Sequence, residues 1–271
     1  MKLRRFLLAA AIGLPLLALL AWLFWPGQDT PLAQLMRRDL TWQAMQERGT
    51  WRVGLDPSFP PFETLDAGNQ PAGYDVELAK ALAAQWGLEA EIVPIGFDSL
   101  FDALKAAKID AVLSAYPYDE RLTRDVAFSQ PYFDAGLRLA VPEGSPIGGV
   151  DDLAGKRVAV EWGSEGDMIG RQLQRDGLAV ELVPFETPQE AVAALETTGA
   201  VDGVLVDGVT LRQVQAGGGR LVAAGPLLTS SPYVIVLPRR AADLLARVND
   251  GLEALRQQGV LQRLEAEWFG R

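Results

Sequence analysis

The sequence predicts an α/β protein built as two lobes. From Trp51 onwards, short apolar runs typical of strands alternate with amphipathic segments of about ten to fifteen residues. This alternation favours right-handed βαβ units and parallel sheets. It restarts after Pro131, so the strands fall into two sets, each too small for a large domain alone. A chain of 271 residues is long enough for two such lobes.

Residues 1–27 are expected to be a signal anchor or a signal peptide. After three basic residues, the run from Phe6 to Trp25 has 20 residues and no charge, which is about enough to cross a ~30 Å hydrocarbon core. A cleaved signal peptide would end in a site of small residues, but Trp22, Phe24 and Trp25 lie there instead. Such aromatics suit the membrane–water interface. We therefore expect this run to stay as an anchor in the inner membrane, with a periplasmic or extracytoplasmic body in either case.

The first set of elements follows a tether. Residues 28–49 are predicted to form this tether and a short helix, Leu40–Arg48, which Gly49 stops. The next helix is predicted to be capped by Asp75 and to end before Gly87, which can take the left-handed conformation. The full set is the strand Trp51–Leu55, the helix Asp75–Gln85, the strand Glu91–Pro94, the helix Ser99–Lys108 and the strand Ile109–Ser114.

The second set contains one strong helix start. Thr187 can cap, Pro188 suits the first helical position, and Glu190 lies three residues after the cap. That helix is predicted to run to Thr197, where Gly199 closes it. The other predicted elements of this set are the strands Leu137–Val141, Arg157–Val160, Val180–Pro184, Val204–Val206 and Leu221–Ala224 and the helices Gly166–Arg175 and Thr210–Gln215.

The end of the chain lacks a sheet of its own. The strand Tyr233–Leu237 and the helices Ala241–Gln257 and Val260–Trp268 are therefore predicted to return to the first lobe. The expected division is lobe 1 at 50–133 plus 232–271, and lobe 2 at 134–231.

The composition excludes several kinds of chemistry. Histidine and cysteine are both absent, which excludes thiol nucleophiles, Ser-His pairs, imidazole acid–base catalysis and the usual zinc ligands. Of the 25 basic side chains, three (Lys2, Arg4 and Arg5) lie in the N-terminal segment, which leaves 22 against 35 acidic ones. So acidic a body argues against a nucleic-acid partner, because phosphate binding needs concentrated lysine and arginine.

Candidate binding residues follow the predicted strands. In open α/β sheets, ligands lie beyond the C-terminal ends of the strands. In lobe 1 these positions lead to Asp56, Phe59, Phe97, Ser114, Tyr116 and Arg121, and in lobe 2 to Glu161, Ser164, Glu165 and Asp207. An arginine can hold a carboxylate in two hydrogen bonds, an aspartate can accept from an ammonium group, and aromatic faces can cover an aliphatic stem. The two facing edges therefore predict a recess for a small zwitterion.

Motifs along the chain carry a family resemblance. They are Arg48–Gly54, Asp56 with PPFE, GYDVELAKALA from Gly73, Phe97–Leu100, Lys108–Val112, Asp119–Arg121 with Phe128–Tyr132, Asp152–Val158, Gly163-Ser164, Val201–Val204 with Asp207, and Trp268–Gly270. Each is weak alone, but together, in this order and over about Glu47 to Gly270, they are highly specific. The chain resembles the extracellular (periplasmic) solute-binding proteins of family 3, the receptors of polar amino acid ABC importers.

The resemblance implies roles for individual residues. Arg121 matches the arginine that clamps the ligand α-carboxylate, and Asp207 matches the aspartate that accepts from the α-ammonium. Phe59 and Phe97 match the aromatics on either side of the ligand side chain, and Asp56 matches a position that reads its far end. Ser164 and the amide of Glu165 match donors at a helix N-terminus, where the helix dipole favours an anion.

The resemblance also implies a fold and a mechanism. The expected fold is the two-lobed type II periplasmic-binding-protein fold, with two hinge strands crossing near Pro131–Gly136 and Thr229–Tyr233. The lobes would close on an amino acid and present it to an ABC permease in the inner membrane. No catalytic residue, metal or cofactor is expected, and no nucleic acid. The membrane is the further partner, through the N-terminal helix.

Several candidates have a purely structural alternative. Arg121 could be a surface arginine paired with Asp119, and Ser164 could be only a helix cap whose capping box Asp167 completes. Phe62, next to the candidate Phe59, is expected to be core. The chain also departs from the family pattern. Tyr116-Pro117-Tyr118 stands where a small hydroxyl is usual. A carboxylate at Glu161, joined by Asp56, favours a cationic or strongly polar ligand side chain.

Two other functions remain open from the sequence. The first is an enzyme similar to cyclohexadienyl dehydratases, with Glu161 or Glu165 as a general acid. The second is a membrane-anchored sensor, in which closure signals to another protein. The ordinary binding residues are present and no dedicated acid–base pair is evident, so a binding protein is the prediction.

Overall fold

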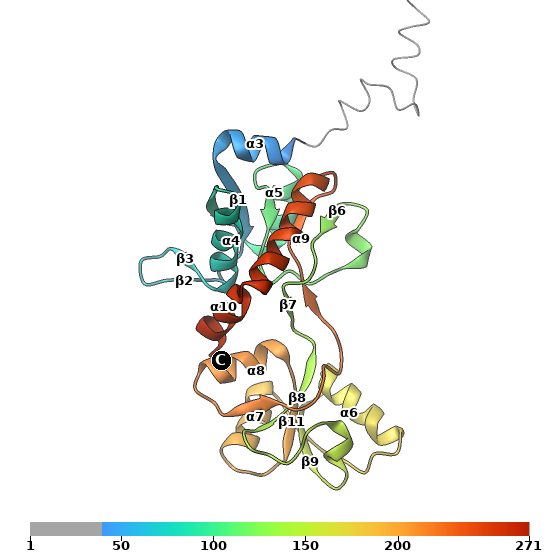
Figure 1. Cartoon of the computed structure of the whole chain (residues 1–271). Helices are drawn as coiled ribbons and strands as arrows, with labels where there is room; N and C mark the ends of the chain where they lie inside the picture. The colour runs from blue at the N-terminus through green and yellow to red at the C-terminus, as the bar shows by residue number, and fades with distance from the viewer. Residues whose placement is uncertain (1–39, 271) are drawn as a thin grey trace, which may run out of the picture.

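The structure is a computed structural model in which residues 40–270 are described (Figure 1). The predicted anchor and most of the tether fall outside these residues. Between residues 40 and 270, no helix has the length and apolar composition that crossing a bilayer requires.

Two five-stranded sheets form the cores of the two lobes. The sheet of lobe 1 has the order β4-β1-β5-β14-β6. Its strands are β1 (Thr50–Leu55), β4 (Glu89–Pro94), β5 (Ala111–Val112), β6 (Val126–Phe128) and β14 (Val236–Pro238). The helices of this lobe are α3 (Thr41–Arg48), α4 (Tyr74–Gln85), α5 (Phe97–Lys105), α9 (Ala242–Gln257) and α10 (Val260–Phe269). The hairpin of β2 (Thr64–Leu65) and β3 (Pro71–Ala72) projects from one side (Figure 1).

The sheet of lobe 2 has the order β10-β9-β11-β8-β12. Its strands are β8 (Leu137–Pro142), β9 (Arg157–Glu161), β10 (Glu181–Phe185), β11 (Gly203–Asp207) and β12 (Leu221–Ala223). Three α-helices pack on it: α6 (Glu165–Arg175), α7 (Pro188–Glu196) and α8 (Gly208–Ala216).

The sheets are mixed rather than wholly parallel, so this part of the prediction is wrong. β1 is parallel to β4 and β5, and β9 is parallel to β10 and β11. By contrast, β8 is antiparallel to β11 and β12, and β14 is antiparallel to β5 and β6. The reason is where the chain enters each sheet. β8 and β14 come directly from the connections between the lobes, so they run opposite to strands whose C-terminal ends point toward those connections.

Two short strands connect the lobes. β7 (Phe133–Asp134) pairs antiparallel with β13 (Pro232–Tyr233), at the positions predicted for the crossing strands. The Asp134 carboxylate accepts hydrogen bonds from the backbone N–H groups of Gly136 and Ser231 and from the Ser230 hydroxyl. The predicted strand Tyr233–Leu237 is therefore wrong as one element, since the chain breaks it into β13 and β14.

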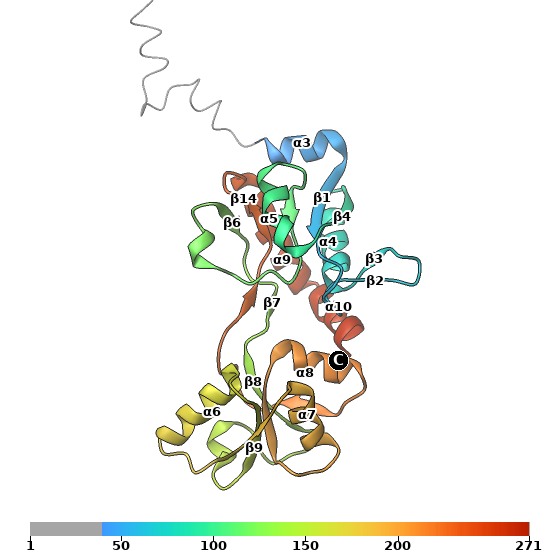
Figure 2. The same ribbon diagram turned by 180° about the vertical axis from the view of Figure 1, so that it is seen from behind.

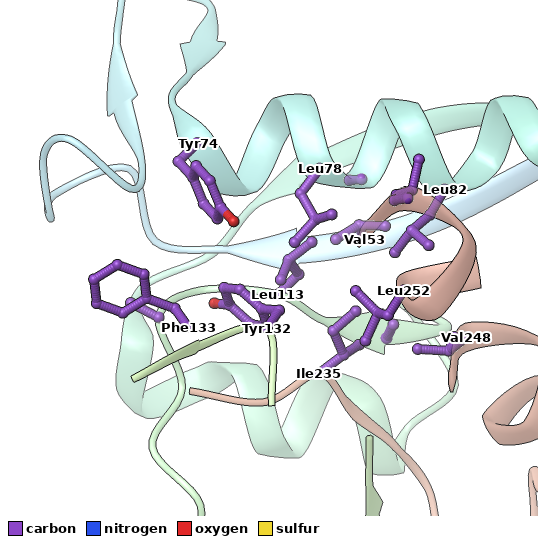
Figure 3. Close-up of a cluster of buried hydrophobic side chains, with 14 of the residues drawn as sticks. Val53, Tyr74, Leu78, Leu82, Leu113, Tyr132, Phe133, Ile235, Val248 and Leu252 are labelled. Atoms are coloured by element: carbon purple, nitrogen blue, oxygen red, sulfur yellow. The ribbon is translucent and has the colours of Figure 1, made fainter. Parts of the chain in front are cut away.

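The lobe 1 core brings together all parts of that lobe. Figure 3 shows Leu78 and Leu82 of α4 directed toward Val53 of β1, with Ile235 and Leu252 of the C-terminal segments on the other side. The fully buried ring of Phe62 packs edge-on against Phe133 and Phe269. The prediction that Phe62 is core is confirmed, and the return of the C-terminal segments to lobe 1 is observed.

Local signals placed some helix ends correctly and others wrongly. Gly49 ends α3 in the left-handed conformation at φ 76°, and the Thr187 side chain caps α7 by accepting from Glu190 N–H. Asp75, however, does not cap α4. Gly73 occupies the N-cap position, and Asp75 lies in the first turn with its side chain fully buried. The predicted helix at Ser99 also starts earlier, at Phe97.

The lobes touch at a second place besides the crossing strands. Arg212 of α8 forms an ion pair of 2.8 Å with Glu265 of α10, and the Gln213 side-chain amide donates to the Pro60 carbonyl at 3.0 Å. In both views α10 lies on one side of β7, while β6 and α6 lie on the other (Figures 1 and 2). We call the Arg212, Gln213, Pro60 and Glu265 contact the rear contact.

Candidate functional site

A cavity of about 450 Å³ lies at the C-terminal ends of the lobe 1 strands. Four of the predicted binding residues line it: Asp56, Phe59, Phe97 and Ser114. The other lining residues are Ser58, Glu63, Ala115, Pro117, Ser231 and Tyr233. The last two belong to the segment that crosses between the lobes, so the cavity opens where the lobes meet.

Asp56 is held by the first turn of the neighbouring helix. Its Oδ2 accepts from the backbone N–H of Phe97 at 2.8 Å, and its own N–H donates to the Ser114 hydroxyl at 3.0 Å. These bonds join the ends of β1 and β5 to the start of α5. The carboxylate therefore has a fixed position on the cavity wall.

Aromatic rings form the apolar part of the wall. Phe59 and Phe97 are 39% and 42% exposed, which is unusual for phenylalanine and leaves ring surface available to a ligand. Phe97 stacks on Tyr116 with ring centroids 5.3 Å apart, and Phe59 stacks on the buried Phe62 at 5.8 Å. Tyr116 thus supports a wall residue without lining the cavity itself.

Arg121 does not line the cavity in this structure. It lies in the short 3-10 helix η1 (Glu120–Leu122), with 89% of its side chain exposed. Its guanidinium donates to the Asp119 carboxylate, with a closest distance of 2.7 Å. These hydrogen bonds lower the pKa of Asp119. Because exposed ion pairs contribute little net stability, Arg121 can exchange Asp119 for another carboxylate at small cost.

In lobe 2, Ser164 makes hydrogen bonds within its own lobe. It is the N-cap of α6, where its oxygen accepts from Asp167 N–H at 3.3 Å and its hydroxyl donates to the Glu161 carbonyl at 2.7 Å. Asp167 accepts from the Gly163 N–H rather than from the cap residue, so the capping box is modified. Glu165 accepts from the Thr229 hydroxyl at 3.1 Å.

Asp207 lies at the end of β11 and caps α8. Its carboxylate accepts from the Thr210 N–H at 2.8 Å and from the Thr210 hydroxyl at 2.6 Å. Burial raises the pKa of Tyr233 to about 12, and the negative charge of Asp207 adds to that increase. Asp207 is therefore close enough to Tyr233 to influence this cavity residue, although Asp207 does not line the cavity.

The predicted binding residues therefore lie in separate groups. The lobe 1 wall is assembled, but Arg121 and the lobe 2 candidates Glu161, Ser164, Glu165 and Asp207 are not among the lining residues. Among the described lining residues there is no lysine or arginine, whereas Asp56 is acidic. This arrangement can hold a polar or cationic group against aromatic faces.

Sequence reasoning missed Glu63 and Tyr233 as cavity residues. Glu63 is the last residue of the PPFE motif, which was the available signal, and it is only 1% exposed. Its Oε1 accepts from the Ser114 hydroxyl at 2.8 Å. Tyr233 was predicted as the start of a strand and the end of a crossing segment, but not as a binding residue, and it lines the cavity at that crossing.

A cavity at the junction of two α/β lobes, connected by two crossing strands, defines a protein that binds a small molecule between its lobes. Residues 51–271 match the family model described as bacterial extracellular solute-binding proteins, family 3. The chain belongs to this family, which confirms the prediction made from its motifs.

Named relatives cover most of the chain. It is 29% identical over 229 residues to the L-cystine-binding protein TcyJ of Escherichia coli, covering 83% of this chain and 85% of the relative. It is 30% identical over 228 residues to the L-arginine-binding protein of Pseudomonas aeruginosa, covering 80% and 87%.

A solved structure shows the same fold. The L-cystine solute receptor of Neisseria gonorrhoeae, in its unliganded open conformation, superposes with a TM-score of 0.75 at 21% identity, covering 86% of this chain and 98% of that receptor. The periplasmic-binding-protein fold is thereby confirmed. Family membership also confirms a binding protein rather than an enzyme, and an extracytoplasmic location for the body.

Proposed function

We propose that the protein captures an amino acid by closing its two lobes and delivers it to an ABC importer. The lobes in this proposal are 50–133 plus 232–271, and 134–231. Support comes from the named relatives, which bind cystine or arginine. It also comes from an ancestral arginine-binding protein bound to arginine, a solved structure that is 34% identical to this chain and superposes with a TM-score of 0.50.

The proposed binding mode uses both lobes. Arg121 would leave Asp119 and clamp the α-carboxylate, while Asp207 would accept from the α-ammonium group. Phe59 and Phe97 would cover the ligand side chain on its two faces. Because these groups do not share one cavity in the open arrangement, a ligand that contacts all of them binds the closed form better, and this difference drives closure.

The remaining candidates would complete the enclosure. Ser114 and Tyr116 would support the lobe 1 wall. The helix N-terminus at Ser164 and Glu165 would meet the ligand carboxylate from lobe 2. The hinge would be formed by β7 and β13.

The proposed ligand has a cationic or strongly polar side chain. Asp56 is fixed on the cavity wall by its bond to Phe97 N–H, and closure would bring Glu161 of lobe 2 toward the same space. No basic side chain among the described lining residues opposes them. An acidic ligand would place a further carboxylate against these charges.

The N-terminal run, residues 6–25, is proposed to anchor the receptor in the inner membrane. Its apolar length supports this proposal. Tethering would raise the effective concentration of the receptor at the permease. Retention of the full chain in the membrane fraction after alkaline extraction would test the anchor, and release of a shortened protein would contradict it.

The observation that carries the proposed function is the assembled wall of Asp56, Phe59 and Phe97 at the junction of the lobes. A thermal-shift panel on the detergent-solubilised full chain, with arginine, lysine, glutamine, cystine and glutamate, tests it. Ligand binding raises the midpoint according to RT ln(1 + [L]/Kd). Arginine or lysine is expected to give the largest shift, a preference for glutamate would contradict the charge argument, and no shift with any amino acid would contradict the function.

A further inference from the structure

Two buried carboxyl groups lie together beneath the cavity. Glu63 is 1% exposed and Asp75 is fully buried. Their side chains are within hydrogen-bonding reach of each other. No lysine or arginine of the described residues is among the main influences on the pKa of either carboxyl group. Two ionised carboxylates in such a place would be strongly unfavourable.

One oxygen of each carboxyl group accepts hydrogen bonds from other residues. Asp75 Oδ2 accepts from the Ala115 N–H at 2.6 Å and from the Tyr132 hydroxyl at 3.0 Å. Glu63 Oε1 accepts from the Ser114 hydroxyl at 2.8 Å. The two remaining oxygens, Glu63 Oε2 and Asp75 Oδ1, are buried without a hydrogen-bond partner in the described structure. Buried polar atoms in native proteins are nearly always paired, and one proton between these two oxygens would pair both.

We propose that Glu63 and Asp75 share a single proton, and that the neutral Glu63 acts as a positioning residue for the binding wall. Through this pair, Glu63 fixes the Ser114 hydroxyl, which accepts from Asp56 N–H at 3.0 Å. Asp56 in turn holds the first turn of α5, where Phe97 lies. The statement about ligand binding rests on the proposed function, whereas the shared proton does not.

Burial and the neighbouring charges favour one bound proton on the Glu63–Asp75 pair at neutral pH. Burial, followed by the charge of Asp75, raises the pKa of Glu63, and Asp56 adds to the increase. Burial also raises the pKa of Asp75, although a proton held by Glu63 and the hydrogen bonds from Ala115 N–H and the Tyr132 hydroxyl oppose this increase. The other titratable groups near the pair are the phenols Tyr74, Tyr132 and Tyr233. Burial raises the pKa of each phenol, and the charge of Asp75 adds to the increase.

The shared proton has a direct test that requires no ligand. Infrared spectra of the full chain should show the carbonyl band of a protonated carboxylic acid at pH 7 to 8. The band should shift when the glutamates carry ¹³C carboxyl groups, and it should vanish in Glu63→Gln. Glu77→Gln, which removes a surface carboxyl of α4, should leave the band in place. Absence of the band from the wild-type protein would overturn the proposal.

The positioning role is tested by a matched pair of substitutions. Glu63→Leu keeps the volume but loses both hydrogen bonds, so arginine should bind about tenfold more weakly, the loss expected for one net buried hydrogen bond. Glu63→Gln can accept from Ser114 and donate to Asp75, so it should recover most of that loss. The positioning role is refuted if Glu63→Leu binds arginine as tightly as the wild type, or if Glu63→Gln binds arginine as weakly as Glu63→Leu.

The two proposals fail in different ways. A wild-type protein that shows the infrared band but binds no amino acid would refute the proposed function and leave the shared proton standing. If Glu63→Leu does not fold, the Gln variant and the band still decide the proposal.

Discussion

Arg121 pairs with Asp119 on an exposed surface, and the proposed binding mode requires it to exchange that partner for the ligand carboxylate. Arg121→Ala would leave this carboxylate enclosed without its cation. We expect arginine affinity to fall by about 100-fold or more, because bidentate charge-assisted hydrogen bonds are among the strongest polar contacts. Calorimetry measures the change.

Arg124→Ala is the matched control for this substitution, because Arg124 is an exposed arginine three residues further along the chain. The affinity of the Arg124→Ala variant for arginine should remain within about twofold of the wild type, as is usual for surface positions away from a binding site. Equal effects of the two substitutions would show that Arg121 acts only through the general charge of the surface.

The carboxyl pair predicts a pH dependence of stability with a definite sign. The folded protein keeps a proton on Glu63 above the pH at which an unfolded glutamate loses it, so it binds more protons than the unfolded chain there. The free energy of unfolding therefore falls as pH rises above about 4.5, by at most about 1.4 kcal/mol per pH unit for this group. The window extends to the raised folded pKa of about 11.

Glu63→Gln has no proton to lose and should decline less in stability between pH 5 and pH 9. Urea denaturation of both proteins at several pH values measures this difference. Parallel stability curves for wild type and variant would show that Glu63 titrates normally.

Among single residues, the sequence predicted those cavity residues whose position depends only on the end of a strand. Asp56, Phe59, Phe97 and Ser114 were predicted to lie together because each follows a predicted strand, and the structure places all four around one cavity. Tyr116 and Arg121 were predicted by the same rule and do not line it. Glu63 was missed because its position depends on a tight loop in which Phe59 and Glu63 bond to each other. Asp75 was predicted to be a helix cap because the local sequence favours that role. Its burial beside Glu63 depends on the tertiary fold, which the local sequence does not reveal.

Among the helices and strands, the rear contact between α8 and α10 is expected to stabilise the open arrangement of the two lobes. The crossing strand β7 lies between this contact and the side where β6 and α6 face each other (Figures 1 and 2). Rotation about the crossing strands that closes the latter side should separate Arg212 from Glu265. Their ion pair, at 2.8 Å, would then stabilise the open form only.

Glu265→Gln should consequently increase arginine affinity, by about two- to fivefold, the range expected for a partly exposed ion pair. Glu253→Gln removes an ion pair within α9 and should leave the affinity unchanged. Calorimetry on both variants measures the effect. A lower affinity of Glu265→Gln would place the ion pair in the closed form instead.

Predictions of elements succeeded where local chemistry decides them. The Thr187 start and the Gly49 stop are set by hydrogen bonds within a few residues. The directions of β8 and β14 were not predictable in this way, because they depend on the chain entering each sheet from the connection between the lobes. The hairpin β2–β3 was missed because its strands have only two residues each.

For the whole molecule, the sequence indicated two lobes but not how far apart the binding residues of the two lobes lie. Candidates from both lobes were expected around one recess, but the structure brings together only four of the lobe 1 candidates, Asp56, Phe59, Phe97 and Ser114. The relative position of two lobes is an equilibrium that a ligand shifts, so no pattern within one lobe encodes it. The four lobe 2 candidates therefore depend on closure for their role.

The central claim, that an amino acid closes the lobes, is tested most directly by the distance between them. The chain contains no cysteine, so Arg124→Cys beside η1 and Met168→Cys on α6 would attach spin labels at two sites only, both exposed. Double electron–electron resonance should show the distance between the labels shorten on saturation with L-arginine, and remain unchanged in the Arg121→Ala background. An unchanged distance in a protein that calorimetry shows to be saturated would contradict the account.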